Sequence, residues 1–250
     1  MGEGQGEGKT EYQMTATPSN STELGTLLSG EAAALAGWTG KFESRRFAFH
    51  IAVIVAGAGC YGAAMGWWRD PLQALYVGIK FPLILLLTAV GNALLNAMLA
   101  PLLGLNVTLR QSLLAVLMSF AITSAILGAF SPLLAFVVWN APAMSADVKA
   151  TLPYAFIKLT HVMVIAFAGI GGNVRLFQLL AHLGGSKVVA KRVLIAWLGV
   201  NLLLGSQLTW IARPFIGAPQ LPVAFLREGA LKGNFYENVY QTVTDLFDFD

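Results

Sequence analysis

The chain has 250 residues, of which 56% are hydrophobic and only 12% are charged, whereas charged residues make up about a quarter of an ordinary soluble domain. This composition excludes an ordinary water-soluble domain and places the chain in the membrane class. The formal net charge of +3 comes from basic residues at the ends of apolar runs, a pattern of membrane topology that argues against a nucleic-acid partner. The single cysteine, Cys60, leaves no pair for an intramolecular disulfide.

The first part of the chain divides into two segments. Residues 1–20 are rich in Gly, Glu, Thr and Ser, and such a composition buries too little apolar surface to offset chain entropy, so we expect a disordered tail. In residues 21–46, apolar side chains recur at helical spacing while Glu23 lies off their stripe. We predict an amphipathic surface helix here, with a soluble linker helix as the alternative.

Residues 47–212 contain five apolar runs, each long enough as a helix to cross a hydrocarbon core of about 30 Å. The predicted spans are 47–68, 81–103, 112–139, 152–172 and 193–211, with Lys80 placed just before the second. The sequence therefore predicts an all-α polytopic integral membrane protein. No span contains a carboxylate, which argues against a proton relay or a cation-coupled transporter.

Small residues repeat at every fourth position of the first span, at Ala58, Gly62 and Gly66. A stripe of this kind lets another helix backbone approach closely. It could form a dimer seam or contact another span of the same chain. We favour the second interpretation because four further spans must be packed.

Ionisable groups inside the membrane are hypotheses for functional residues. Lys158 and His161 lie one turn apart in the fourth span, so we expect them to face the same way, and no span supplies a carboxylate partner. A lysine near a span end can reach outward, and a neutral histidine can bond a neighbouring helix. We favour that structural interpretation over an anion pathway or a water-lined pore.

Four amides complete the candidate polar cluster: Asn92, Asn96, Asn201 and Gln207. Such amides commonly bridge helices, and they could instead line a permeation path. A third alternative makes Ser206 and His161 the nucleophile and base of an intramembrane hydrolase, but that chemistry needs the two groups within hydrogen-bond reach. We expect no cofactor and no metal site.

Prolines dominate the start of the tail, residues 213–250, and must end the fifth span near Arg213. Arg213 itself is a candidate anchor to lipid phosphate at the membrane border. Asn234 and Glu237 have the spacing of a capping pair that begins a new helix. We expect this last helix to be held by docking of its apolar stripe, since its acidic end opposes the helix dipole. The stripe consists of Phe235, Val239, Val243, Leu246 and Phe247.

The tail segments GSQLTW, RPFIG, LPVAFLR and GNFYENVY, with KFPLILLLT and GNALLNAMLAPLLG upstream, resemble an uncharacterised family of bacterial multi-span membrane proteins. The resemblance covers about residues 24–245 and implies a bacterial inner membrane location, but no activity. The layout of an N-terminal tail followed by five spans is also similar to that of Rab-GTPase-interacting membrane proteins.

Basic residues in the connections favour a cytoplasmic N-terminus by a narrow margin. The set assigned to the cytoplasmic side is Lys41, Arg45, Arg46, Arg110, Arg175, Lys187, Lys191 and Arg192. We predict a non-enzymatic membrane component, a scaffold or assembly partner that binds another protein or a second copy of itself within the lipid bilayer. The alternative is a small channel or transporter whose cavity is lined by Lys158, His161, Asn92, Asn96 and Asn201; a lipid-modifying enzyme or protease comes third.

Overall fold

The computed structural model describes residues 20–29, 32–40, 43–142, 151–217 and 221–247. Within these ranges every regular element is a helix: α1 (Asn20–Ser29), α2 (Ala32–Gly40), α3 (Ser44–Trp67), α4 (Pro71–Leu102), α5 (Leu109–Trp139), α6 (Thr151–Gly184), α7 (Lys187–Ile211) and α8 (Phe235–Phe247). The all-α prediction is confirmed. The predicted disordered tail, apart from its last residue, lies outside the described residues, as does Lys41.

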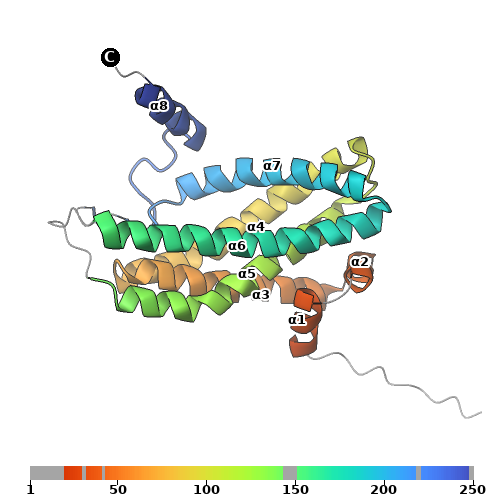
Figure 1. Cartoon of the computed structure of the whole chain (residues 1–250), viewed down its shortest axis with the longest axis horizontal. Coiled ribbons are helices and arrows are strands. Elements are labelled where there is room, and N and C mark those ends of the chain that lie inside the picture. Colours follow the sequence, from red (N-terminus) through yellow and green to blue (C-terminus); the bar gives the residue numbers. More distant parts are fainter. Residues whose placement is uncertain (1–19, 30–31, 41–42, 143–150, 218–220, 248–250) are drawn as a thin grey trace, which may run out of the picture.

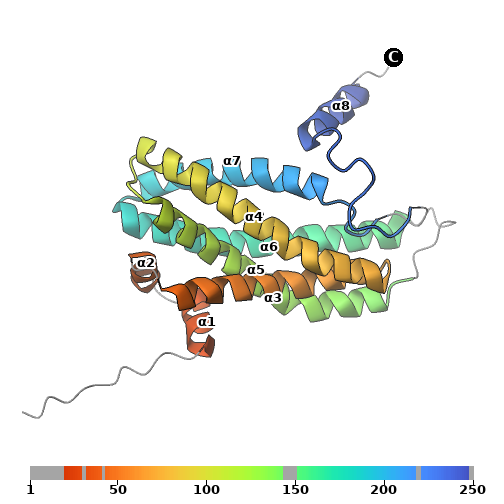
Figure 2. The ribbon, with the colours of Figure 1, turned by 180° about the vertical axis from the view of Figure 1, so that it is seen from behind.

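Five of these helices, α3 to α7, are long and apolar enough to cross a membrane. They lie side by side along the long axis of the molecule, and Figure 1 shows the α4–α5 and α6–α7 connections at one end, with α1 and α2 near it. The view from behind in Figure 2 shows the α3–α4 turn and the end of α7 at the opposite end. The protein is an all-α polytopic membrane protein, and its outer surface exposes large apolar side chains, such as Leu87 and Leu94 on α4.

The second membrane helix begins ten residues earlier than predicted, at Pro71 instead of residue 81. Asp70 caps it by accepting a hydrogen bond from the backbone N–H of Leu72 at 2.7 Å, and proline is well suited to the first helical position. Lys80 and Pro82 consequently lie inside α4, and both are buried. The interpretation of Lys80 as a flanking residue was therefore wrong.

The other long helices also extend beyond the apolar runs. Thr108 and Gln111 form a capping box at the start of α5. The fourth apolar run, predicted to end at residue 172, continues as one helix, α6, to Gly184. Ser186 caps α7, and the first turns of this helix contain Lys187, Lys191 and Arg192. The length of an apolar run therefore underestimates the length of its helix, because polar turns extend the helix beyond the run.

Small residues set the distances between the central helices. A Cβ atom added at Gly62 would lie 2.6 Å from the carbonyl oxygen of Val77. A Cβ atom added at Gly66 would lie 2.6 Å from the carbonyl oxygen of Gln73, and Ala58 of the same stripe is fully buried. Gly62 and Gly66 thus face α4 of the same chain, in the arrangement favoured above.

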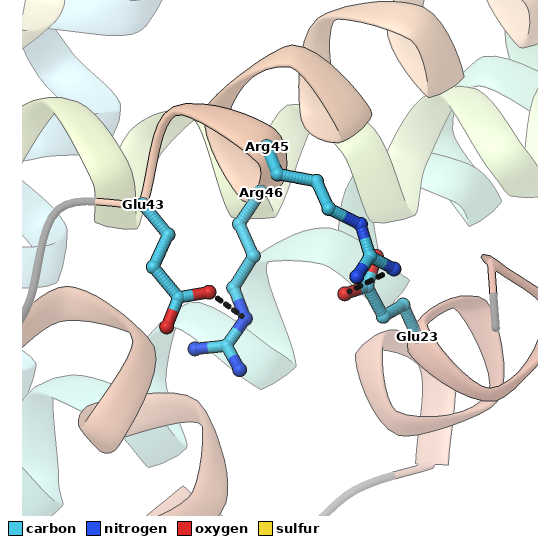
Figure 3. Close-up of polar contacts among 4 residues, drawn as sticks. All are labelled: Glu23, Glu43, Arg45 and Arg46. Atoms are coloured by element: carbon cyan, nitrogen blue, oxygen red, sulfur yellow. Dashed lines mark ion pairs between the residues drawn. The ribbon is translucent and has the colours of Figure 1, made fainter. Parts of the chain in front are cut away.

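Two short helices, α1 and α2, replace the single predicted surface helix. Glu23 on α1, expected to lie off the buried stripe, is only 3% exposed and forms an ion pair with Arg45 at 3.2 Å. Figure 3 shows this pair beside the pair of Glu43 and Arg46, whose atoms lie 3.1 Å apart. Glu23 lies on the buried side because Arg45 supplies the countercharge that allows a carboxylate to be buried.

The last helix does not dock as expected. Phe235 is half-buried at its first turn, whereas Val239 and Val243 are 43% and 45% exposed. Figures 1 and 2 show α8 extending away from the bundle. The prediction of the capping pair is confirmed, because Asn234 Oδ1 accepts from the backbone N–H of Glu237 at 2.7 Å. Only the first turn contacts α7, so the apolar stripe is left largely uncovered by the described residues.

Candidate functional site

The predicted polar cluster is distributed over several sites. Asn92 and Asn201 line one cavity of about 180 Å³ between α4, α5, α6 and α7. Asn173 and Trp197 line it too, and the sequence did not single them out. Asn92 Oδ1 and Trp197 Nε1 are buried and have no hydrogen-bond partner among the described residues. Such a cavity is large enough for a few water molecules that could satisfy these atoms.

Asn96 lies one turn further along α4 than Asn92 and is completely buried. Neither of its side-chain amide atoms has a hydrogen-bond partner within the part of the chain that the structure describes. The helix-bridging role considered for it therefore lacks a bond here. A neighbouring bridge that sequence reasoning missed is made by Ser112, whose hydroxyl donates to the carbonyl oxygen of Ala93 at 3.1 Å.

His161 and Lys158 do not share an environment, contrary to the expectation that they face the same way. His161 is buried, and its Nδ1 lies 3.1 Å from the hydroxyl of Tyr61 on α3. The two rings meet edge to face with centroids 5.7 Å apart. Lys158 is exposed near the start of α6. His161 is thus an interhelical contact, as the structural interpretation expected.

Lys158 lines a pocket of about 800 Å³ between α6 and the loop that follows α7. Arg213, Arg227 and Glu228 line the same pocket. The guanidinium carbon of Arg213 lies 3.1 Å from the ring centroid of Trp210, and that of Arg227 lies 5.0 Å from it. Three basic side chains from separate parts of the sequence are therefore gathered at one end of the bundle.

A second basic contact holds this loop against α4. The ammonium of Lys80, a residue that is 2% exposed, donates to the carbonyl oxygens of Ala212 at 3.1 Å and Pro214 at 2.7 Å. It also lies over the rings of Phe215 and Phe225, 5.7 Å and 5.2 Å from their centroids. Carbonyl dipoles and aromatic faces thus take the place of a carboxylate partner for this cation.

Two further side chains strengthen the contact between α4 and the loop. Gln73 Nε2 donates to the carbonyl oxygens of Pro214 and Phe215 at 2.9 Å and 2.7 Å. Arg69 Nη2 donates to the carbonyl oxygen of Leu221 at 2.8 Å. We call Arg69, Gln73 and Lys80 the α4 clamp. It fixes the start of the tail, and thereby the position of the basic pocket.

Gln207 and Ser206 hold the first turn of α8. Gln207 Oε1 accepts from the backbone N–H of Phe235 at 3.0 Å. The hydroxyl of Ser206 lies 2.7 Å from that of Tyr236 and also bonds the carbonyl oxygen of Leu202. The hydrogen bonds of Ser206 therefore go to α7 and α8, whereas His161 bonds Tyr61. This arrangement offers no support for a nucleophile–base pair.

Comparisons of the chain with family models, with curated proteins and with solved structures found no match.

The residues of the α4 clamp and the basic pocket that sequence reasoning missed have partners in other segments of the chain. Lys80 bonds residues more than a hundred positions away, and Arg227 meets Arg213 only because the loop folds back, with the backbone N–H of Arg227 donating to the carbonyl oxygen of Arg213 at 3.1 Å. One available signal was the pair Asp70 and Pro71, which begins α4 early enough to place Lys80 inside a helix.

Proposed function

We propose that the protein is a non-enzymatic component of a membrane assembly and that α8 binds a partner protein. The observation that carries the proposal is the uncovered apolar stripe of α8. Val239 and Val243 of the stripe are 43% and 45% exposed, and the neighbouring Tyr240 is 70% exposed. An amphipathic helix that leaves its own bundle in this way matches helix-in-groove recognition, in which residues at i and i+4 anchor in an apolar groove.

Charge supports a protein over a lipid surface as the occupant of this stripe. Residues 235–250 contain Glu237, Asp245, Asp248 and Asp250 but no lysine or arginine. Helices that lie on anionic membranes usually carry basic residues on their polar face. The acidic face of α8 favours a partner groove with a basic rim, and it disfavours pairing of two α8 helices because their like charges would repel.

The distribution of the polar residues weakens the channel alternative. Asn92 and Asn201 line a cavity of about 180 Å³, His161 bonds Tyr61, and Lys158 lines a different pocket at the end of the bundle. A permeation path needs polar groups along one continuous route. These groups instead lie in separate places, which favours a structural component over a channel.

The same proposal includes the location. The resemblance to bacterial multi-span proteins supports the inner membrane, and the Lys and Arg bias of the connections supports a cytoplasmic N-terminus. With an odd number of spans, α8 and its partner would then lie on the opposite side.

Substituting the stripe tests the proposal. Val239→Glu and Val243→Glu should each weaken partner binding roughly fivefold or more, because loss of an interface anchor costs more than about 1 kcal/mol. Gln241→Glu is the matched control, since it adds the same charge on the opposite face of α8. The measurement is recovery of a stoichiometric partner after solubilisation of native membranes in mild detergent, combined with photo-crosslinking from position 243.

A partner that crosslinks to position 243 and is lost in both valine variants but kept in Gln241→Glu would agree with the proposal. Equal recovery in all three variants would contradict it, as would a wild-type protein that carries no stoichiometric partner.

A further inference from the structure

The pocket lined by Lys158, Arg213, Arg227 and Glu228, which we call the basic pocket, has features of a binding site. It has a volume of about 800 Å³, and Phe215 and Pro222 contribute apolar wall. The basic side chains come from the start of α6 and from two points of the loop after α7. Their convergence is therefore produced by the fold and not by a run of basic residues in the sequence.

The guanidinium groups of both arginines lie over the ring of Trp210. The guanidinium of Arg213 stacks on Trp210, and its Nε donates to the carbonyl oxygen of Trp210 at 3.2 Å. Arg213 Nη2 and Arg227 Nε are buried and have no hydrogen-bond partner in the described ranges. A buried guanidinium N–H without an acceptor is costly, so these groups call for an acceptor that the described part of the chain does not supply.

The charges of Arg213 and Arg227 also call for an anion in the pocket. Burial and the nearby charge of Arg227 lower the pKa of Arg213, as expected where two like charges approach each other. Glu228 is the carboxylate that lines the pocket, and it is exposed and forms no ion pair with either arginine within the described residues. An anion between the arginines would relieve their repulsion and bond the free N–H groups.

The position of the pocket narrows the class of anion. Arg213 follows the end of α7 at Ile211 by two residues, so the pocket lies at the level where a span meets the headgroup region, and Trp210 sits at the same border. Ile216 and Leu221 line the pocket together with the basic side chains and offer an apolar surface for acyl chains. Guanidinium groups match phosphate oxygens in geometry and charge.

We propose that the basic pocket binds a phosphate group, which the headgroup of an anionic phospholipid or free phosphate could supply. This site is separate from the stripe of α8 and goes beyond the proposed function. Because the loop that leads to α8 contains both arginines, a bound phosphate would also fix the base from which α8 extends.

The test uses the purified full chain in detergent, titrated with phosphatidylglycerol and followed by native mass spectrometry. Arg213→Gln and Arg227→Gln should weaken phosphatidylglycerol binding roughly 10- to 100-fold, the range expected for loss of a charge-assisted hydrogen bond. Lys232→Gln is the matched control, because it removes one positive charge from an exposed position in the same tail. Lys158→Gln removes an exposed cation of the pocket, so it tests the site even if an arginine variant fails to fold.

A second arm adds inorganic phosphate at millimolar concentration. Retention of phosphatidylglycerol assigns the site to lipid, whereas displacement assigns it to free phosphate, and either result supports a phosphate site. Equal phosphatidylglycerol binding by the wild type, Lys158→Gln and whichever arginine variants fold would overturn the proposal. Equal loss in Lys232→Gln would do the same, because it would show a response to net charge alone.

Discussion

Replacing Gly57 with leucine should abolish recovery of the folded, monodisperse protein. A Cβ atom at Gly57 would overlap the backbone carbonyl oxygen of Ser124, and one at Gly128 would lie 2.9 Å from the Cα of Gly57. The α3–α5 crossing is therefore in direct backbone contact at this point. Because the obstacle is backbone and cannot rotate away, the cost should exceed the usual range of about 1–3 kcal/mol for an overpacked core.

Gly199→Leu is the matched control for Gly57→Leu. Gly199 also lies within a long helix, α7, but a Cβ atom there would meet nothing within 4 Å. Both substitutions introduce the same apolar side chain and raise helix propensity by the same amount. The measurement is size-exclusion chromatography in detergent together with a thermal melt; a Gly57→Leu protein that elutes and melts like Gly199→Leu would contradict the packing described for α3 and α5.

Replacing Lys80 with methionine should release the start of the tail from α4. The substitution keeps a long apolar side chain but leaves the carbonyl oxygens of Ala212 and Pro214 without the ammonium that they accept from at 3.1 Å and 2.7 Å. Hydrogen bonds to charged groups contribute about 1.5–3 kcal/mol each. Relief of the desolvation cost of a buried ammonium offsets part of this loss.

A net local loss of about 2 kcal/mol corresponds to a roughly 30-fold larger equilibrium constant for opening of the loop, and hence to roughly 30-fold faster hydrogen exchange. Hydrogen exchange of the backbone amides in residues 221–233 measures this opening. Lys191→Met is the control, since Lys191 is exposed on α7 at the other end of the bundle. Exchange rates in Lys80→Met that match those of Lys191→Met would show that the α4 clamp does not hold the loop.

The sequence was sufficient for the class of fold and for the local signals at helix ends. Five apolar runs became five long helices, and Asn234 with Glu237 began α8 as their spacing predicted. These features depend on hydrophobic length and on neighbouring residues, and both are present in any short window of sequence. The start of α4 and the end of α6 were misjudged because polar turns extend both helices beyond their apolar runs.

The candidate site was harder to predict because it depends on contacts between distant segments. Lys158 and His161 are one turn apart, yet one is exposed and the other bonds Tyr61. Depth along a span is readable from sequence, but the direction in which a side chain points around the helix depends on the neighbours that the fold supplies. For the same reason, nothing near Arg213 in the sequence indicated that Arg227 would share its pocket.

The five-span bundle is tested most directly by finding on which side of the membrane two segments lie. Three spans, α5, α6 and α7, separate the α4–α5 connection from the tail, so these two segments must lie on opposite faces of the membrane. Single cysteines at Asn106 and Lys232, both exposed, would be introduced separately into a Cys60→Ser background. Sealed vesicles of one orientation would then be treated with a membrane-impermeant maleimide. We predict that one position reacts in intact vesicles and the other only after permeabilisation; reaction of both from the same side would contradict the five-span bundle.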